Sequence, residues 1–79
     1  MEQNTFPLSD LHEGEKGRVA ALLCTGSERR RMLDLGLIHG TTVQALQASP
    51  SGDPVAYFIR GAVIALRNED AEKIIVTPH

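Results

Sequence analysis

The chain consists of short apolar runs that are separated by glycine, proline and small polar residues. Short runs of this kind, rich in Val, Ile and Leu and bounded by turn residues, are typical of β-strands. The pattern predicts five strands, at residues 18–24, 41–47, 55–59, 62–66 and 74–76. In the first strand, alternation places Val19, Ala21 and Leu23 on one face.

Helical signals occur at three places in the chain. Ser27 is a candidate N-cap, and good helix formers continue from it to Leu35. Gly36 is placed to end this helix in a left-handed conformation after about two turns. We expect one further helical turn capped by Ser9 and another capped by Asn68.

The predicted elements define a fold class. Strands without alternating long helices exclude a doubly wound sheet. Short strands between tight turns, such as the hairpin turn Arg60-Gly61, instead predict a mainly β domain with one short helix, folded as a small closed or partly closed barrel of about five strands. The 79 residues fit one domain. We expect it to cover residues 8–79, with residues 1–7 as a flexible lead-in.

Charge and composition narrow the functional classes. The net charge is −2 and three aromatic residues are present, which argues against a domain that coats phosphates, so no nucleic acid is expected. The single cysteine excludes an internal disulfide and favours a reducing compartment. No apolar run approaches the roughly 20 residues that cross a bilayer, and residues 1–5 lack the basic and apolar regions typical of a signal peptide. These features predict a soluble, cytoplasmic protein that meets a membrane only through a partner.

Side chains that could carry chemistry lack the required spacing. No lysine follows a phosphate-binding glycine-rich loop, and no nucleophile, base and orienting acid can be assigned. The favoured interpretation is a buried, inert thiol at Cys24 and a solvated imidazole at His39, with metal ligation as the alternative. We therefore expect no enzyme, no cofactor and no metal site of the chain's own. The residues weighed as metal ligands are His12, Cys24, His39 and His79.

The arginines at 29–31 are the strongest charged feature. Three consecutive helical residues spread over about 200 degrees, so these arginines cannot share one narrow face. They either present a basic edge to an acidic partner or phosphate, or form solvated surface paired with Glu28 or Asp34. Leu33 is expected to be partly exposed beside them. Leu37 and Ile38 either extend an apolar patch there or pack in the core.

Several sequence pieces occur in an order that resembles the FeoA family along nearly the whole chain. The resemblance implies an SH3-like barrel that works beside FeoB, a ferrous-iron permease with a cytoplasmic GTPase domain. Iron would then be met only through that partner. The matching pieces are Leu8-Ser9-Asp10-Leu11, Gly14, Gly17, Arg29 to Leu33, Leu35-Gly36-Leu37, Gly40, Gly52-Asp53-Pro54-Val55, Arg60-Gly61, Ile64-Ala65-Leu66-Arg67, Ala71 and Ile74-Ile75-Val76.

These observations lead to a functional hypothesis. The chain is a non-catalytic interaction module that acts on the cytoplasmic part of an FeoB-like permease and supports ferrous-iron uptake. We place its docking face on the helix and the turn that follows, at Arg30, Leu33, Leu37 and His39. The alternatives are a nucleic-acid-binding small barrel and a stand-alone regulatory domain related to iron-dependent repressors. A homo-oligomer formed through strand edges or the apolar patch also stays open.

Overall fold

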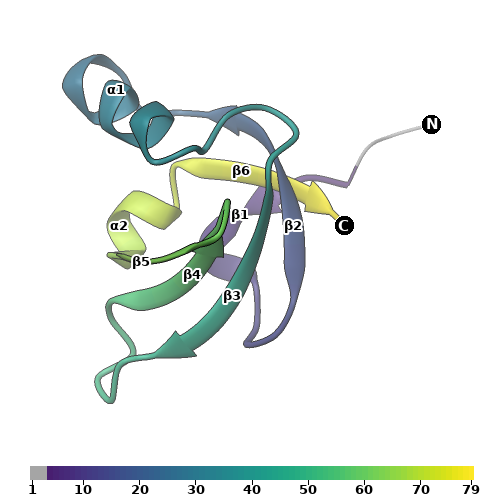
Figure 1. Cartoon of the computed structure of the whole chain (residues 1–79), viewed down its shortest axis with the longest axis vertical. Coiled ribbons are helices and arrows are strands. Elements are labelled where there is room, and N and C mark those ends of the chain that lie inside the picture. Colours follow the sequence, from purple (N-terminus) through teal and green to yellow (C-terminus); the bar gives the residue numbers. More distant parts are fainter. Residues whose placement is uncertain (1–3) are drawn as a thin grey trace.

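The computed structural model describes residues 4–79 and confirms a mainly β fold with two short α-helices (Figure 1). Its strands form one antiparallel sheet with the order β1-β6-β2-β3-β4-β5. The strands are β1 (Phe6–Pro7), β2 (Lys16–Leu22), β3 (Thr42–Ala48), β4 (Val55–Ile59), β5 (Ala62–Leu66) and β6 (Ile74–Pro78). The helices are the 3-10 helix η1 (Leu8–Asp10), α1 (Gly26–Asp34) and α2 (Asn68–Ala71).

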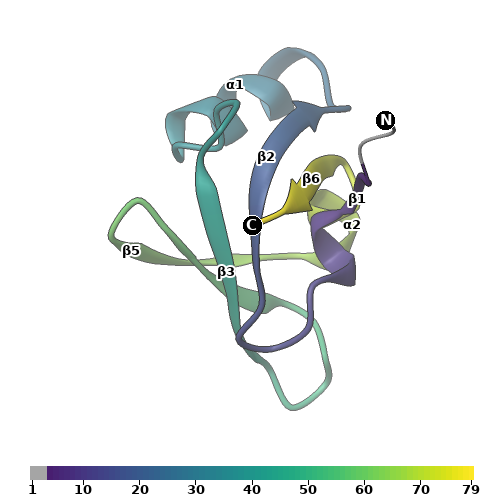
Figure 2. The ribbon, with the colours of Figure 1, turned by 90° about the vertical axis from the view of Figure 1, so that its right-hand side faces the viewer.

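The sheet curls so that its two ends approach each other, as the views in Figures 1 and 2 show together. The sequence places η1 directly after β1, and α2 directly after β5. These two short helices contact each other, which brings the β1 end near the β5 end. The result is the small, partly closed barrel that the spacing of strands predicts.

The first strand, β1, is an addition to the five predicted strands. Phe6 lies opposite Val76 and Pro7 lies opposite Ile75, both in β6. Proline is tolerated here because β1 is an edge strand, where a missing N–H removes no bond inside the sheet. The expected lead-in therefore ends earlier than predicted, since residues 6 and 7 belong to the sheet. Residues 1–3 of that lead-in lie outside the described residues.

Strand β2 departs from the predicted alternation because it contains a bulge. The register shifts between Val19, opposite Val76, and Ala21, opposite Ile75. An extra residue in one strand reverses the face of every side chain after it. Val19 is consequently buried, whereas Ala21 is exposed and Leu23 is 62% exposed. The prediction that these three side chains share a face is wrong.

The N-caps differ from the predicted ones. Pro7 precedes η1, so Ser9 lies inside that helix, and Thr25 rather than Ser27 precedes α1. Helix α2 begins at Asn68 itself, and the cap comes from a distant loop. The Asn68 N–H donates to Asp53 Oδ1 at 2.9 Å. Asp53 thereby satisfies a backbone donor that a local side chain would otherwise have to bind.

The C-terminal end of α1 has the hydrogen bonds of a Schellman motif. Gly36 has φ +98°, its N–H donates to Leu33 O at 3.0 Å, and the Leu37 N–H donates to Met32 O at 3.0 Å. This pattern confirms that Gly36 ends the helix in a left-handed conformation. It also turns the chain inward, so that Met32 and Leu37 are both buried in the core.

The turn between β4 and β5 is a two-residue loop of type I′. Ile59 lies opposite Ala62, and the intervening Arg60 and Gly61 have φ +49° and +85°. Type I′ turns need positive φ at both central residues, because their twist then matches that of the strands. Gly61 takes the role that the sequence predicts. Arg60 adopts a conformation that is uncommon for a residue with a long side chain.

The core lies on the inner face of the curled sheet. It is built from the aliphatic residues that composition requires, together with one aromatic ring, that of Tyr57. Burial raises the pKa of the Tyr57 phenol above its usual range. Among residues 4–79, no charged or polar side chain is buried in this core. The buried residues are Leu8, Val19, Cys24, Met32, Leu37, Val43, Ala45, Tyr57, Ile59, Leu66, Ala71, Ile74 and Val76.

The helices of the described chain are all short. None of them has the length and apolar character that a membrane-spanning helix needs.

Candidate functional site

The outer surface of α1 holds two of the four residues predicted to form a docking face. Arg30 and Leu33 are separated by three positions, which places them side by side on a helix. Both line a shallow hollow of about 310 Å³, and Leu33 is 38% exposed. We call this surface the α1 hollow. Its lining residues are Gly26, Arg29, Arg30, Leu33 and Asp34.

The three consecutive arginines of α1 have separate environments, as their angular spread predicts. Arg31 Nη2 lies 3.1 Å from Asp70 Oδ2, which ties α1 to α2. Arg29 Nη1 donates to the carbonyl oxygen of Leu22 at 3.4 Å. Within the described chain, the Arg30 side chain makes neither a hydrogen bond nor an ion pair. Its guanidinium is therefore available to an outside group.

The acidic residues near the arginines do not form the predicted pairs. Glu28 Oε1 accepts a hydrogen bond from Lys73 Nζ at 3.3 Å. This contact raises the pKa of the Lys73 ammonium group. Asp34 lines the α1 hollow beside Arg30. The predicted pairing with Glu28 is wrong, because that carboxylate is directed toward the β6 side of the helix.

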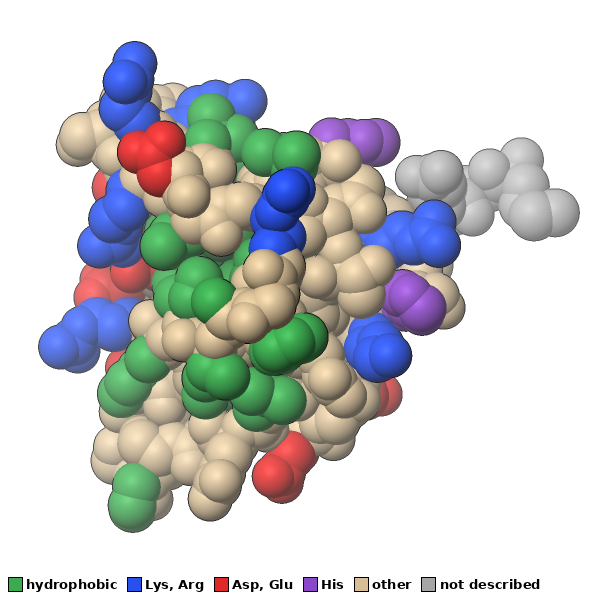
Figure 3. Space-filling view, in the orientation of Figure 1, with side chains coloured by type: hydrophobic (Ala, Val, Ile, Leu, Met, Phe, Trp, Pro, Cys, Tyr) green, Lys and Arg blue, Asp and Glu red, His purple; other side chains and the backbone are tan. Residues whose placement is uncertain are grey.

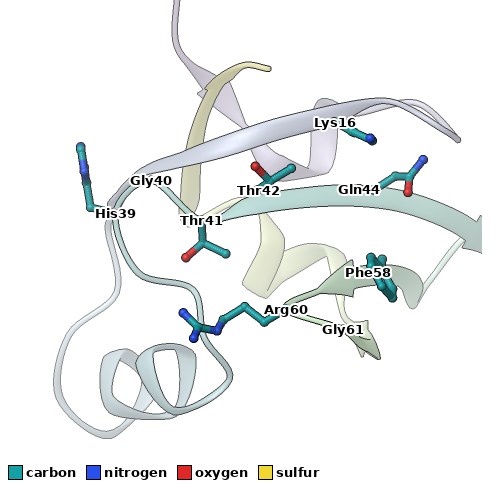
Figure 4. Close-up of a pocket in the computed structure, with 9 residues that line it drawn as sticks. All are labelled: Lys16, His39, Gly40, Thr41, Thr42, Gln44, Phe58, Arg60 and Gly61. Atoms are coloured by element: carbon teal, nitrogen blue, oxygen red, sulfur yellow. The ribbon is translucent and has the colours of Figure 1, made fainter.

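Leu37 and His39 do not belong to the same surface as Arg30. Leu37 has no exposed area because the Schellman motif directs it into the core. The prediction that Leu37 is a surface contact residue is wrong. His39 is exposed but lies at a different groove, and in Figure 4 it points away from the other side chains. The predicted docking face is thus reduced to Arg30 and Leu33.

An open groove of about 610 Å³ lies on the outer face of the sheet (Figure 4). We call it the sheet groove. Strands β2, β3 and β4 and the turns next to them contribute its walls. Its lining residues are Lys16, His39, Gly40, Thr41, Thr42, Gln44, Phe58, Arg60 and Gly61.

The register of the sheet aligns a row of side chains across this outer face. Lys16 lies opposite Gln44, Gln44 lies opposite Phe58, and Phe58 lies opposite Val63. The row therefore runs from a cation through an amide to an aromatic ring and an aliphatic side chain. Phe58 is 43% exposed and Val63 is 65% exposed. Apolar side chains exposed together in this way often mark an interaction site.

The charges around the sheet groove have one sign. Lys16 and Arg60 supply cations, and no acidic side chain lines the groove within residues 4–79. Arg60 points from the β4–β5 turn toward α1 (Figure 4), and its side chain lies against Gly36. This electrostatic environment suits a carboxylate or phosphate group better than a cation.

Sequence reasoning missed the sheet groove as a candidate site. Gln44 and Phe58 belong to predicted strands, whereas Lys16 precedes the strand predicted at residues 18–24 and belongs to β2 in the structure. Strand pairing alone decides that these positions lie side by side. A single sequence does not reveal which residues of neighbouring strands lie opposite each other.

The described residues do not gather metal ligands at one place. No group of three histidine, cysteine or acidic residues within residues 4–79 is arranged to hold an ion. Cys24 is buried with its thiol free, whereas His12 and His39 are exposed. His12 is occupied locally, since its backbone N–H donates to Glu15 Oε1 at 2.7 Å and its ring lies 3.1 Å from the same oxygen.

The comparison with protein families covers almost the whole fold. A family model described as the FeoA domain matches residues 6–78, from the first residue of β1 to the last residue of β6. The chain belongs to the FeoA family. The predicted resemblance is thereby confirmed.

Individual relatives agree with the FeoA assignment. A Porphyromonas gingivalis protein named Fe(2+) transport protein A/Fe(2+) transporter FeoB fusion protein is 41% identical over 69 residues, which are 87% of this chain. The chain spans only 8% of that relative's length. The solution structure of FeoA from Chlorobium tepidum is 33% identical, with a TM-score of 0.86 over 92% of this chain and 70% of that one.

A second FeoA structure confirms the SH3-like fold. The crystal structure of Stenotrophomonas maltophilia FeoA is described as a prokaryotic SH3 domain protein. Its TM-score is 0.81, and the match covers 90% of this chain and 88% of that chain at 24% identity. At this identity the likeness shows the fold alone, and the fold is the barrel that the strand pattern predicts.

Proposed function

We propose that the chain is a non-catalytic accessory module of ferrous-iron uptake that binds the cytoplasmic part of an FeoB-like permease. The observation that supports this most directly is the Porphyromonas gingivalis relative, whose name joins an Fe(2+) transport protein A to an FeoB transporter in one polypeptide. Fusion keeps two modules at a high effective concentration, which is useful when they act on each other. This domain would reach the same proximity to an FeoB-like permease by binding it.

The α1 hollow is the surface that we assign to this contact. It combines the free guanidinium of Arg30 with the partly exposed Leu33. Arginine is enriched among the residues that dominate interface energies, and a neighbouring apolar side chain excludes water from its contacts. Leu37 supports the surface from inside, through the turn that ends α1. His39 lies outside this docking face.

The proposal that the chain is non-catalytic is supported by the causes of the pKa shifts in its titratable groups. Hydrogen bonds from His12 lower the pKa of Glu15, burial raises the pKa of Tyr57, and the hydrogen bond with Glu28 raises the pKa of Lys73. Each shift therefore follows from a local hydrogen bond or from burial. Ferrous iron in this proposal is the cargo of the partner permease. The chain needs no iron ligand of its own to act as the proposed module.

The test is a pull-down of the host permease with tagged protein, from solubilised membranes and from the purified cytoplasmic part. The double variant Arg30→Ala and Leu33→Ala should retain at least about tenfold less permease, since both side chains lie at the proposed contact. The matched control is Arg18→Ala and Leu23→Ala, which removes an exposed arginine and an exposed leucine outside the α1 hollow. Equal retention by folded test and control variants would contradict the proposed docking face. Recovery of no permease with the unmodified chain would contradict the function itself.

A further inference from the structure

Strand β5 forms one edge of the sheet, and no strand within residues 4–79 pairs with its outer side. It pairs with β4 on one side, and the strand order places no neighbour on the other. Its five residues are all apolar. Natural edge strands usually carry a charge, a proline or a bulge that prevents further pairing. Strand β5 has none of these features between Ala62 and Leu66.

The backbone of β5 offers hydrogen-bonding groups to an added strand. A two-residue hairpin closes on a hydrogen-bonded pair, here Ile59 and Ala62, and such pairs then recur at every second residue. Val63 and Ala65 fall between those pairs, so their N–H and C=O groups point away from β4. These groups have no backbone partner elsewhere in residues 4–79. Their side chains are also exposed, which leaves the approach open.

Space for an extended segment lies alongside β5. A hollow of about 370 Å³ separates β5 from the end of α1 and from α2. In Figure 3, hydrophobic side chains gather on this face below α1, with both blue basic and red acidic side chains along its margin. Leu35 and Ile64 supply partly buried apolar surface there. A strand added to β5 could therefore insert alternate side chains into this hollow.

The positive charges at the two ends of β5 favour a bound segment with acidic ends. Arg60 precedes the strand and Arg67 follows it, and both side chains are exposed. Neither makes an ion pair within residues 4–79. The segment that fits is extended, apolar in its middle and acidic at its ends.

A second copy of this chain fits the edge poorly. If two β5 strands paired antiparallel through Val63 and Ala65, Arg67 of one copy would face Gly61 of the other. It would then lie one residue from the second copy's Arg60. The same like-charge contact would occur at both ends of the pair, and such contacts are destabilising. Charge thus favours an acidic partner over self-association.

We propose that β5 is a second docking site, at which an extended segment of a partner protein with acidic ends adds a strand to the sheet. The contact is distinct from the α1 hollow and does not depend on it. Main-chain hydrogen bonds to Val63 and Ala65 would supply affinity, and Arg60 and Arg67 would supply selectivity.

The experiment titrates ¹⁵N-labelled protein with a short capped peptide of alternating Val and Thr that carries aspartates at both ends. Two control peptides carry lysines at the ends, or a central proline that cannot continue a ladder. The acidic peptide should shift the amide signals of Val63 and Ala65 and slow their hydrogen exchange. The lysine and proline peptides should bind at least about tenfold more weakly.

Variants of the protein complete the test. Val63→Pro removes one outward N–H without breaking the β4–β5 ladder, and Val63→Lys blocks the edge with a charge if the proline variant does not fold. Each should weaken the acidic peptide at least about tenfold. Arg60→Asn combined with Arg67→Gln should remove the preference for acidic over lysine ends.

Three results would overturn the proposal. One is unchanged binding by both folded Val63 variants. Another is a set of amide shifts confined to Lys16, Gln44 and Phe58, which would place the peptide in the sheet groove. The third is a peptide-free dimer that Val63→Lys dissociates, because the charge argument would then have failed.

Discussion

The two tight turns of the molecule that contain Gly36 and Gly61 place apolar residues in opposite environments. After Gly36, the chain enters the core and Leu37 has no exposed area. After Gly61, the chain becomes an edge strand and Val63 is 65% exposed. In the sequence both turns look alike, as a glycine among apolar residues. The hydrogen-bond pattern separates them, because a Schellman motif folds the chain back onto its helix whereas a type I′ turn continues a sheet.

An apolar residue beside a turn is therefore not by itself an interaction residue. Leu37 contributes stability as a fully buried member of the core. Val63 contributes little to the core and remains available to an outside strand. Substitutions at the two turns should therefore separate stability from binding.

The largest expected effect is at Leu37. Leu37→Ala should lower the free energy of unfolding by about 2–5 kcal/mol, because it leaves a cavity where a fully buried leucine packs. The matched change Val63→Ala should cost less than about 1 kcal/mol, since that side chain is mostly in solvent. Urea unfolding followed by circular dichroism measures both. Equal losses in the two variants would show that the turns are not different in the way described.

The next effect is at Gly36. A Cβ at Gly36 would lie 2.6 Å from Arg60 Cδ, and φ there is +98°. Gly36→Ala should therefore cost more than about 1 kcal/mol of unfolding free energy. The matched control is Gly40→Ala, where φ is +89° but no atom lies within 4 Å of the added Cβ. Combining Gly36→Ala with Arg60→Ala should recover part of the difference between the two, and an additive result would refute the contact.

Tyr57, on the inner face of the β4–β5 hairpin, should make the free energy of unfolding depend on pH in the alkaline range. Burial raises the pKa of Tyr57, so the unfolded chain releases this proton at a lower pH than the folded chain does. Stability from this group is full below about pH 10 and falls as the pH rises further. Tyr57→Phe should flatten that alkaline loss in urea melts.

Lys73 titrates in the same alkaline range and needs its own control. Its pKa is raised chiefly by the hydrogen bond with Glu28, so its contribution is also lost as the pH rises through the folded pKa. The pair is exposed, and water screens it. Lys73→Ala should therefore change the alkaline slope less than Tyr57→Phe does. A larger change with Lys73→Ala than with Tyr57→Phe would show that the Lys73–Glu28 ion pair dominates the alkaline loss of stability.

The smallest expected effect is at Arg60. Its φ of +49° is unusual for arginine, whereas Asn-Gly is a preferred pair for a type I′ turn. Arg60→Asn should raise the unfolding free energy by roughly 0.5 kcal/mol. Thermal melts check this, with Arg67→Asn as the control at an ordinary surface position. Destabilisation by Arg60→Asn would mean that the packing of Arg60 against Gly36 outweighs the backbone strain.

Features set by neighbouring residues could be predicted from the sequence. The limits of β4 and β5 and the roles of Gly36 and Gly61 all follow from apolar runs and from the conformational freedom of glycine. The partial exposure of Leu33 follows from its angle to Met32 on the helix. These predictions needed no knowledge of which strand lies beside which.

Features set by pairing between distant segments could not be predicted. The bulge after Val19 depends on β6, and the pairing of Phe6 depends on Val76. The burial of Leu37 depends on the hydrogen bond that its N–H makes to Met32, together with the packing below it. The sheet groove likewise exists because the register sets Lys16 beside Gln44. Each requires long-range geometry that a local pattern leaves open.

The capping of α2 by Asp53 has a consequence for how the barrel assembles. Helix α2 has no side-chain cap from its own N-terminal flank, and its first N–H depends on a loop fifteen positions earlier. Asn68 strengthens the link by donating from its side chain to Gly52 O at 3.2 Å. The cap of this helix therefore depends on the pairing of β4 with β5, which sets Val55 opposite Leu66 and so holds the loop beside Asn68. Strand β6 follows α2 directly in the chain. We therefore expect β6, α2 and the loop at residues 52–53 to unfold together as one cooperative unit.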